Sequence, residues 1–568
     1  MASSHRRENG DGLANGDAGK NIPKEFTDII GGHGYFQMTM FTFFFFCSVP
    51  HCLHNLVMAF FAPNIDHWCA RPPQIIQANI SVEQWRNASL PLVRSRIGSE
   101  EISRCTMYAA SVNNGSLSVD KSRDPVKCSA WEYDTTFYHN TMVDEWDLVC
   151  DREWLVSMSK TVYMVAFLIA ATTCGQMSDR FGRRKVVIVC LIDFLIASSL
   201  TLLSTNFIMF LVLRFFVALG ITSIFTVSYV IMTEIVSLEY RSIYCFTFKY
   251  GWVFGYMLMP YIAWLVPSWF WFQMIITLPW FGLLCVFWVV PETPRWLLTH
   301  GKHAELEQVL IRAARLNGKD AKQAKADIHL YVTHSTQKEE KNSKTVFDLL
   351  RTPALRRNTI NIYFCWFIIS YIYYALSWNT NDLGGDPYWN FFMCGAVELP
   401  SGLIFMVICR YIGHRTGLLI ANVLAGLCLL AMIFVPPEMI WLTITLSMSG
   451  KFFNNASFDI VYVYTAEIFP TVVRNVAVGS SSTFARIGAL IAPFIRQVAD
   501  VTHYTVPMIV PGTLSILSGL LVLLLPETLG KKVPDTLEEG EIFARKQDLH
   551  RNSAKHKNLT NGVEMVER

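Results

Sequence analysis

The sequence predicts an all-α membrane protein with twelve transmembrane helices in two six-helix repeat halves and a large extracellular loop. Three observations support this fold class. Of the 568 residues, 52% are hydrophobic and only 16% are charged, a composition typical of a chain that crosses a membrane many times. Apolar runs of about 20 residues, the length that spans a bilayer, occur twelve times. Short motifs also repeat between the two halves of the chain.

The twelve predicted spans define an N-terminal half, 35–290, and a C-terminal half, 358–526. The first half contains the spans 35–62, 155–176, 184–204, 207–235, 242–265 and 268–290. The second contains the spans 358–380, 387–409, 416–436, 438–466, 476–497 and 505–525. Residues 1–34 lack the apolar core and cleavage site of a secretory signal, so we expect them to form a cytosolic tail. An even number of spans then places the second tail, 527–568, in the cytosol as well.

A long polar segment, 63–154, separates the first two spans and has the features of an extracellular loop. It contains three acceptor sequences for N-glycosylation, at Asn79, Asn87 and Asn114. It also contains four cysteines, which are Cys69, Cys105, Cys128 and Cys150. An even number of cysteines beside glycan acceptors indicates disulfides in an oxidising compartment. Four cysteines can pair in three ways, and the sequence does not select one of them.

A second polar segment, 291–357, joins the two halves and is expected to be a cytosolic linker. Its Lys and Arg residues outnumber its Asp and Glu residues, which favours the cytosolic side of a membrane. Within it, HAELEQVLIRAARLNG (303–318) has apolar residues at helical spacing. This pattern predicts short amphipathic helices.

Three motifs on the expected cytosolic side occur once in each half. The halves share GQMSDRFGRRK (175–185) with RYIGHR (410–415), TEIVSLEYR (233–241) with AEIFPTVVR (466–474), and PET (291–293) with PET (526–528). The offsets within the three pairs are 231, 233 and 235 residues. Three motif pairs at nearly one offset indicate duplicated six-helix halves.

The charges in these motifs predict a cytosolic gate. Acids and bases at the helix ends can pair across the two halves when the cytosolic side is shut, and they must separate when it opens. The alternative is that they only cap helices and follow the preference of basic residues for the cytosol. The second copy differs from the first, because Arg410 stands where Asp179 would. The predicted gate residues are Asp179, Arg180, Arg183, Arg184, Glu234, Arg241, Glu467 and Arg474.

Several motifs resemble those of a known family. GQMSDRFGRRK, PETPRWL and PETLG resemble the major facilitator superfamily. DHWCARPP (66–73), EWDLVC (145–150), LSWNTNDLGGD (376–386) and GKFFNNASFDIVYVYTAEIFPTVVRN (450–475) are similar to the organic cation, anion and carnitine transporter family, and most of all to its carnitine and insect organic cation branch. This resemblance implies polyspecific transport of small organic ions across the plasma membrane by alternating access.

Charges inside the spans that occur in only one half are candidates for contact with the transported molecule, because machinery common to the halves should occur in both. In the second half these are Glu398, Lys451, Asp459 and Arg486. Asp193 and Lys249 meet the same criterion in the first half. Each such charge costs about 2.5–3.5 kcal/mol unless it meets a partner, water or a ligand. Glu398, with a proline two residues on, is a candidate acid for an amine. Lys451 and Asp459 share one helical face with Asn455, so they can instead form a structural polar seam.

Aromatic residues of the seventh predicted span are candidates for holding an ammonium group through cation–π contacts. They are Trp366, Tyr373, Tyr374 and Trp378, and the alternative for each is packing in the core. In the resembling family, cation transporters have an acid at the position of Glu398. At the position of Arg486 they tend to have an acid, whereas anion and carnitine transporters have an arginine. Anion transporters also tend to carry a lysine where this chain has Gly402. An acid, an arginine and no second base therefore suggest a zwitterion such as carnitine. The alternative is that Arg486 only pairs with Glu398 or Asp459.

Other functional classes find little support. The sequence has no nucleotide-binding, hydrolase, zinc or nucleic-acid-binding motif, so we expect neither an enzyme nor a nucleic-acid partner, and no catalytic residue, metal or other cofactor. Coupling to Na⁺ is left open. His51 and His54 can line a cavity, although hydrogen bonds to neighbouring helices are the more common role. We expect a plasma-membrane transporter, surrounded by lipid, for small organic cations or zwitterions; an organic anion exchanger and a transporter-like receptor are the alternatives.

Overall fold

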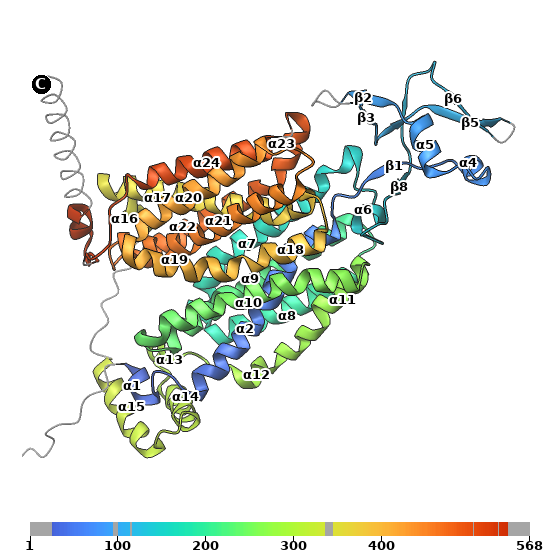
Figure 1. Ribbon diagram of the computed structural model, residues 1–568. Coiled ribbons are helices and arrows are strands. Elements are labelled where there is room, and N and C mark those ends of the chain that lie inside the picture. The colour runs from blue at the N-terminus through green and yellow to red at the C-terminus, as the bar shows by residue number, and fades with distance from the viewer. Residues whose placement is uncertain are drawn as a thin grey trace, which may run out of the picture.

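The computed structural model describes residues 25–94, 100–113, 116–335, 345–503, 505–531 and 533–543 (Figure 1). The first half consists of α2 (Tyr35–Leu56) with α3 (Met58–Phe61), α7 (Trp154–Phe181), α8 (Arg183–Leu200), α9 (Phe207–Ile235), α10 (Leu238–Leu265), and α11 (Trp269–Thr277) with η3 (Leu278–Cys285) and α12 (Val286–Val289). The second half consists of α17 (Pro353–Trp378), α18 (Pro387–Ala396) with α19 (Glu398–Ile412), α20 (His414–Ala431), α21 (Ile440–Ile468), α22 (Arg474–Ile491) with α23 (Ile495–Val501), and α24 (Val506–Val522).

Most of these helices have the length and composition of membrane spans. Nine helical segments in the described residues are long and apolar enough to cross a membrane. Three further helices, α10, α21 and the shorter α24, occupy the remaining predicted positions. Charged residues lie inside α10 and α21, among them Lys249 and Lys451, so these two helices are the more polar ones. The twelve segments overlap the twelve predicted spans one for one.

The two halves lie side by side, with a separate group of elements at each end of the bundle (Figure 1). At one end, here called the loop end, the described residues between 63 and 153 form a small domain. At the opposite end, here called the linker end, lie α1 (Phe26–Ile30), α13 (Pro294–Thr299), α14 (His303–Leu316), α15 (Ala321–Ser335) and α16 (Val346–Leu350). The predicted amphipathic segment is α14, which buries Leu306 and Leu310.

The small domain at the loop end is built from short elements. Its helices are α4 (Pro73–Gln77), α5 (Val82–Ser89) and α6 (Met142–Glu145). Its antiparallel strand pairs are β1 (His67–Cys69) with β8 (Trp131–Tyr133), β2 (Leu92–Arg94) with β3 (Glu100–Ile102), β4 (Thr106–Met107) with β7 (Val126–Lys127), and β5 (Ala109–Asn113) with β6 (Ser116–Asp120). Two disulfides, Cys69–Cys128 and Cys105–Cys150, select one of the three pairings that the sequence allows.

The predicted glycan acceptors lie in or beside the helices of this domain. Asn79 and Asn87 are both exposed, as an acceptor must be. Asn114 lies outside the described residues. Glycosylation of these asparagines stays a prediction.

The sequence repeat has a structural counterpart at the linker end. Gly182, between α7 and α8, has a φ of +103°, and Gly413, between α19 and α20, has a φ of +84°. A Cβ atom at either glycine would lie 2.5 Å from a carboxylate oxygen, of Glu292 and Glu527 respectively. The Glu292 carboxylate accepts hydrogen bonds from the backbone N–H groups of Arg183 (2.7 Å) and Arg184 (3.2 Å), which are otherwise unsatisfied at a helix start. Glu292 therefore closes the corner between α7 and α8, and Glu527 packs against the matching glycine of the second half.

We expect Gly182→Ala to lower the free energy of unfolding by about 1–3 kcal/mol, because an alanine there meets backbone strain and the Glu292 carboxylate. Thermal unfolding of the purified protein in detergent measures this loss. Gly175→Ala in the same motif is the matched control, since its Cβ would meet no atom within 4 Å and alanine favours a helix. Equal melting temperatures for the two variants would contradict this account of the corner.

Candidate functional site

Glu398 lies at a break in the eighth span. Helix α18 ends at Ala396 and α19 begins at Glu398, so the carboxylate is at a helix N-terminus, where negative charge is favoured. Glu398 Oε1 lies 3.2 Å from Lys451 Nζ of α21, and both side chains are fully buried. The acid predicted to meet an amine is thus neutralised by a lysine of the same half.

Lys451 occupies the aromatic cage that the sequence assigned to a ligand. Its Nζ lies 3.3 Å from the ring centroid of Tyr373 and 5.6 Å from that of Tyr256. The ammonium also donates a 2.6 Å hydrogen bond to Ser377 Oγ. Trp252 Nε1 donates to the Tyr373 hydroxyl at 2.9 Å. Because Trp252 and Tyr256 come from α10, both halves build this cage, and an external ammonium must displace Lys451 to enter it.

Asp459 forms its ion pair with the other half of the protein. Its carboxylate accepts from Lys249 of α10, which also donates to Asn455 Oδ1 at 3.3 Å. The Asp459 and Lys249 side chains are 20% and 31% exposed, unlike the Glu398–Lys451 pair. Lys451 and Asp459 of α21 therefore pair with residues of other helices instead of with each other.

Arg486 has no carboxylate within ion-pair distance in the described part of the chain. Its guanidinium carbon lies 4.1 Å from the ring centroid of Phe167 on α7, across the boundary between the halves. Its Nε has no hydrogen-bond acceptor among the described residues. The two acids that could have neutralised it, Glu398 and Asp459, are paired with lysines instead.

A path of ring contacts connects Arg486 to the Lys451 cage. The Phe167 ring lies 5.5 Å from the ring of His51 on α2. The His51 ring lies 5.2 Å from that of Trp252, and Trp252 donates a hydrogen bond to the Tyr373 hydroxyl. The unpaired arginine and the buried ion pair are thus the two ends of one aromatic cluster formed by both halves.

The other predicted aromatics differ in position. The Tyr374 ring lies 5.2 Å from Tyr373 and 4.9 Å from Trp378, so these residues continue the cluster toward the loop end. Trp366 does not join them. Its Nε1 donates to Thr465 Oγ1 at 3.0 Å and its ring packs against Tyr462, which places it in the core of the second half.

The predicted gate residues of the first half pair with one another. Arg183 Nη2 lies 3.0 Å from Glu234 Oε1 and 2.7 Å from Asp179 Oδ1. Arg184 donates to the backbone carbonyl of Phe287 at 2.7 Å, and Arg180 lies over the ring of Phe181. Each of these contacts is made within the first half.

The second half repeats this arrangement with a histidine. His414, which follows Gly413 as Arg183 follows Gly182, places Nδ1 2.9 Å from Glu467 Oε2. Thr528 also donates to Glu467 at 2.6 Å. Arg241 and Arg474 have no ion-pair partner among the described residues, and the Nε of each is unsatisfied. The predicted gate residues therefore do not join the two halves in this structure.

At the loop end, by contrast, an ion pair and hydrogen bonds join the two halves. Arg496 of α23 lies 3.1 Å from Glu153, just before α7. Ser157 donates to the carbonyl of Pro493 at 3.0 Å, and Asn381 donates to the carbonyl of Ala59 at 2.6 Å. Sequence reasoning missed these residues, since charged and polar residues near the ends of spans are common and none belongs to a repeated motif.

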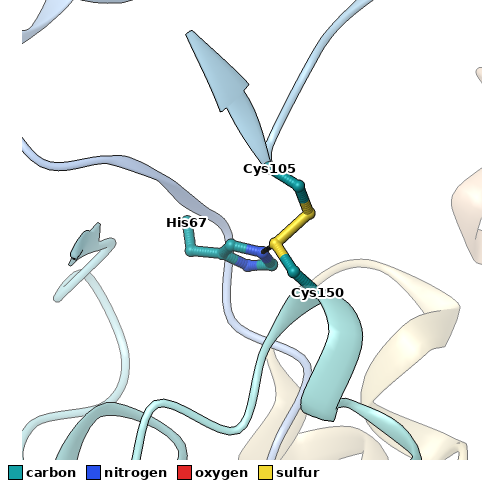
Figure 2. Close-up of side chains that lie close together, drawn as sticks. All are labelled: His67, Cys105 and Cys150. Carbon is teal, nitrogen blue, oxygen red and sulfur yellow. Dashed lines mark hydrogen bonds between the residues drawn. A yellow bond between two sulfur atoms is a disulfide. The ribbon is translucent and has the colours of Figure 1, made fainter. Parts of the chain in front are cut away.

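His67 and one disulfide lie beside this contact region. Figure 2 shows the His67 ring against the Cys105–Cys150 disulfide, with Nε2 3.9 Å from Cys150 Sγ. Burial lowers the pKa of His67. Because the two sulfurs are bonded to each other, they are not free thiolates for a metal ion, and His67 packs against the disulfide as a neutral ring.

Comparison with known proteins agrees with this geometry. Residues 106–538 match the family model described as "Sugar (and other) transporter". The chain is 35% identical over 529 residues to the "Organic cation transporter protein" of Drosophila melanogaster, covering 91% of this chain and 94% of that protein. It is 34% identical to the human "Organic cation/carnitine transporter 2", covering 94% and 96%. The xylose transporter XylE from E. coli, in a partially occluded inward-open conformation, covers 90% of this chain and all of its own chain with a TM-score of 0.53 and 15% identity.

The fold is that of the major facilitator superfamily, and the protein is a membrane transporter rather than an enzyme. More narrowly, the chain belongs to the "Sugar (and other) transporter" family, and its relatives include organic cation and carnitine transporters.

We expect Lys451→Met to destabilise the protein by about 3–5 kcal/mol, because it leaves the Glu398 carboxylate buried without its counter-charge. The double variant Lys451→Met with Glu398→Gln should recover most of this loss, since it removes both charges. Thermal unfolding of the purified variants in detergent measures both effects. A double variant no more stable than Lys451→Met alone would mean that the ion pair is not what makes Lys451 necessary.

Proposed function

We propose that this protein is a plasma-membrane transporter of small organic zwitterions that combine an ammonium with a carboxylate, such as carnitine, and that organic cations are weaker substrates. The observation that carries the proposal is the pairing of charges at the centre of the bundle. Two acids are matched by two lysines, and Arg486 is left without a carboxylate among the residues that the structure describes. The printed name of the human relative includes carnitine, which supports the zwitterion class, while that of the Drosophila melanogaster relative gives organic cations.

Arg486 is suited to the carboxylate end of the substrate. A guanidinium presents its N–H donors in a planar fork that matches both carboxylate oxygens. The side chain is partly exposed between the halves, whereas an uncompensated arginine at membrane depth is costly. A ligand carboxylate supplies the counter-charge of Arg486 and removes that cost, which favours binding of the ligand.

Asp459 is the better candidate for the ammonium end. Both it and Lys249 are partly exposed, so an ammonium can take the place of Lys249 without leaving a buried acid unpaired. Glu398 is fully buried with Lys451 and acts by holding that lysine in the cage. In this assignment the substrate replaces an ion pair between the halves, which couples binding to their relative movement.

The conformation fits an inward-facing step of alternating access. We assign the loop end to the extracellular side, because that domain carries two disulfides and exposed glycan acceptors, and the linker end and both tails to the cytosol. At the loop end an ion pair between Arg496 and Glu153 joins the two halves. At the linker end Arg241 and Arg474 lack ion-pair partners in the described part of the chain and are available to pair across the halves when the cytosolic side closes. The proposed cycle involves no cofactor, and uptake with and without Na⁺ tests for coupling to that ion.

An organic anion exchanger is the second candidate, and one observation favours it. Once the pairs Glu398–Lys451 and Asp459–Lys249 cancel, the positive charge of Arg486 remains at the boundary between the halves. A substrate with carboxylates alone would also satisfy that charge.

Uptake of radiolabelled carnitine, choline and glutarate into cells that express the protein, with and without Na⁺, tests the proposal. We expect saturable carnitine uptake that falls at least about tenfold in Arg486→Ala, because a hydrogen-bonded charge pair contributes about 1.5–3 kcal/mol, while choline uptake persists. Arg123→Ala is the matched control, since Arg123 is an exposed residue of the loop domain. Uptake of glutarate alone would favour the anion exchanger, and saturable binding without uptake would favour a receptor.

A further inference from the structure

A buried histidine at the centre of the site has no hydrogen-bond partner for either ring nitrogen. His51 of α2 is 2% exposed, and neither its Nδ1 nor its Nε2 has a partner in the described part of the chain. Three aromatic rings enclose it, with the Phe225 ring stacked at 4.4 Å and those of Trp252 and Phe167 at 5.2 and 5.5 Å. Its neighbour His54 behaves as the sequence suggested, since its Nε2 bonds to the carbonyl of Ile276 at 3.1 Å.

An unsatisfied imidazole of this kind calls for a physical explanation. A buried polar group without a hydrogen bond costs about 1–3 kcal/mol, and native proteins retain few of them. Asn55 lies one turn further along the same face of α2, is 1% exposed, and interacts with the Tyr374 hydroxyl. Among the described residues, His51 is the side chain of this helix face whose two ring nitrogens both stay unsatisfied.

The position of His51 relates this unsatisfied ring to Arg486. Both side chains contact the ring of Phe167, His51 from the first half and Arg486 from the second. Arg486 is also close enough for its charge to act on the imidazole. A group that binds Arg486 between the halves therefore comes within the surroundings of His51.

The chemistry of the ring restricts what can satisfy it. A neutral imidazole has one N–H donor and one nitrogen acceptor. A carboxylate only accepts and a quaternary ammonium has no N–H to donate, so neither group alone satisfies both nitrogens. A hydroxyl both donates and accepts, so it can bond whichever of the two ring nitrogens faces it.

We propose that His51 is a specificity-determining residue that hydrogen-bonds a hydroxyl adjacent to the substrate carboxylate, so that the transporter selects hydroxylated zwitterions over their deoxy analogues. The inference rests on the proposed function, because Arg486 must hold the carboxylate for the hydroxyl to reach the ring. Arg486 then attracts substrates that carry a carboxylate, and among these His51 selects the ones that also carry a hydroxyl.

The test compares the KM values of L-carnitine and γ-butyrobetaine, which differ only by the hydroxyl. We expect the wild type to have a KM about three- to tenfold lower for L-carnitine, the ratio that corresponds to one neutral hydrogen bond. In His51→Phe, which keeps an aromatic ring but has no polar atom, the two KM values should become equal. His51→Gln, which keeps a donor and an acceptor, should retain part of the preference. His139→Phe at an exposed position of the loop domain is the matched control and should behave as the wild type.

The outcomes separate this inference from the proposed function. If the wild type transports both compounds with equal KM values, or if His51→Phe keeps the preference, His51 does not select the hydroxyl and the inference is wrong, while the proposed function stands. If the wild type transports neither compound, the proposed function fails and the inference fails with it. If His51→Phe does not reach the cell surface, His51→Gln decides the assignment, because an undiminished preference in that variant would overturn the inference.

Discussion

The cost of placing a charge inside a membrane determines how the centre of this protein is built. Each ionised side chain there needs an opposite charge, a polar group or a ligand. Lys451 meets Glu398 inside one half, and Lys249 meets Asp459 across the two halves. Arg214, on α9, donates to the backbone carbonyl of His54 and lies over the ring of Tyr163. In the described part of the chain Arg486 has an aromatic ring but no acid, and the proposed carboxylate of the substrate follows from that unmet requirement.

The two central ion pairs have different consequences for movement. A pair within one half, fully buried, can stay intact while the halves rotate, and it fixes the helix break before Glu398 in relation to α21. A pair between the halves must adjust when they move. Because Lys249 and Asp459 belong to different halves and are partly exposed, a substrate that competes for Asp459 acts at the boundary where alternating access takes place. The glycine corners at Gly182 and Gly413 are internal to each half and are compatible with movement of the halves as rigid bodies.

Much of the fold could be predicted from the sequence, because apolar length and repeated motifs depend on local composition. Arg486 could also be predicted as a candidate for ligand contact, because a single arginine in an apolar run is costly without a partner or a ligand. The partners of the charges were not predictable, because they depend on how each helix is rotated in the bundle. Rotation turns Lys451 into the Tyr373 cage and turns Trp366 toward Thr465, away from it. It also leaves His51 unsatisfied while His54 reaches the carbonyl of Ile276, although both belong to the same short stretch of α2.

The claim that Arg486 is reserved for a carboxylate is tested most directly by equilibrium binding to the purified protein. Tritiated carnitine and tritiated choline share an ammonium, and of the two only carnitine has a carboxylate. Binding to the wild type and to Arg486→Gln isolates the contact between that group and the arginine. The account predicts that the Kd for carnitine rises at least about tenfold in the variant while the Kd for choline changes little. An equal rise for both ligands would contradict it, because Arg486 would then support the site as a whole rather than bind the carboxylate.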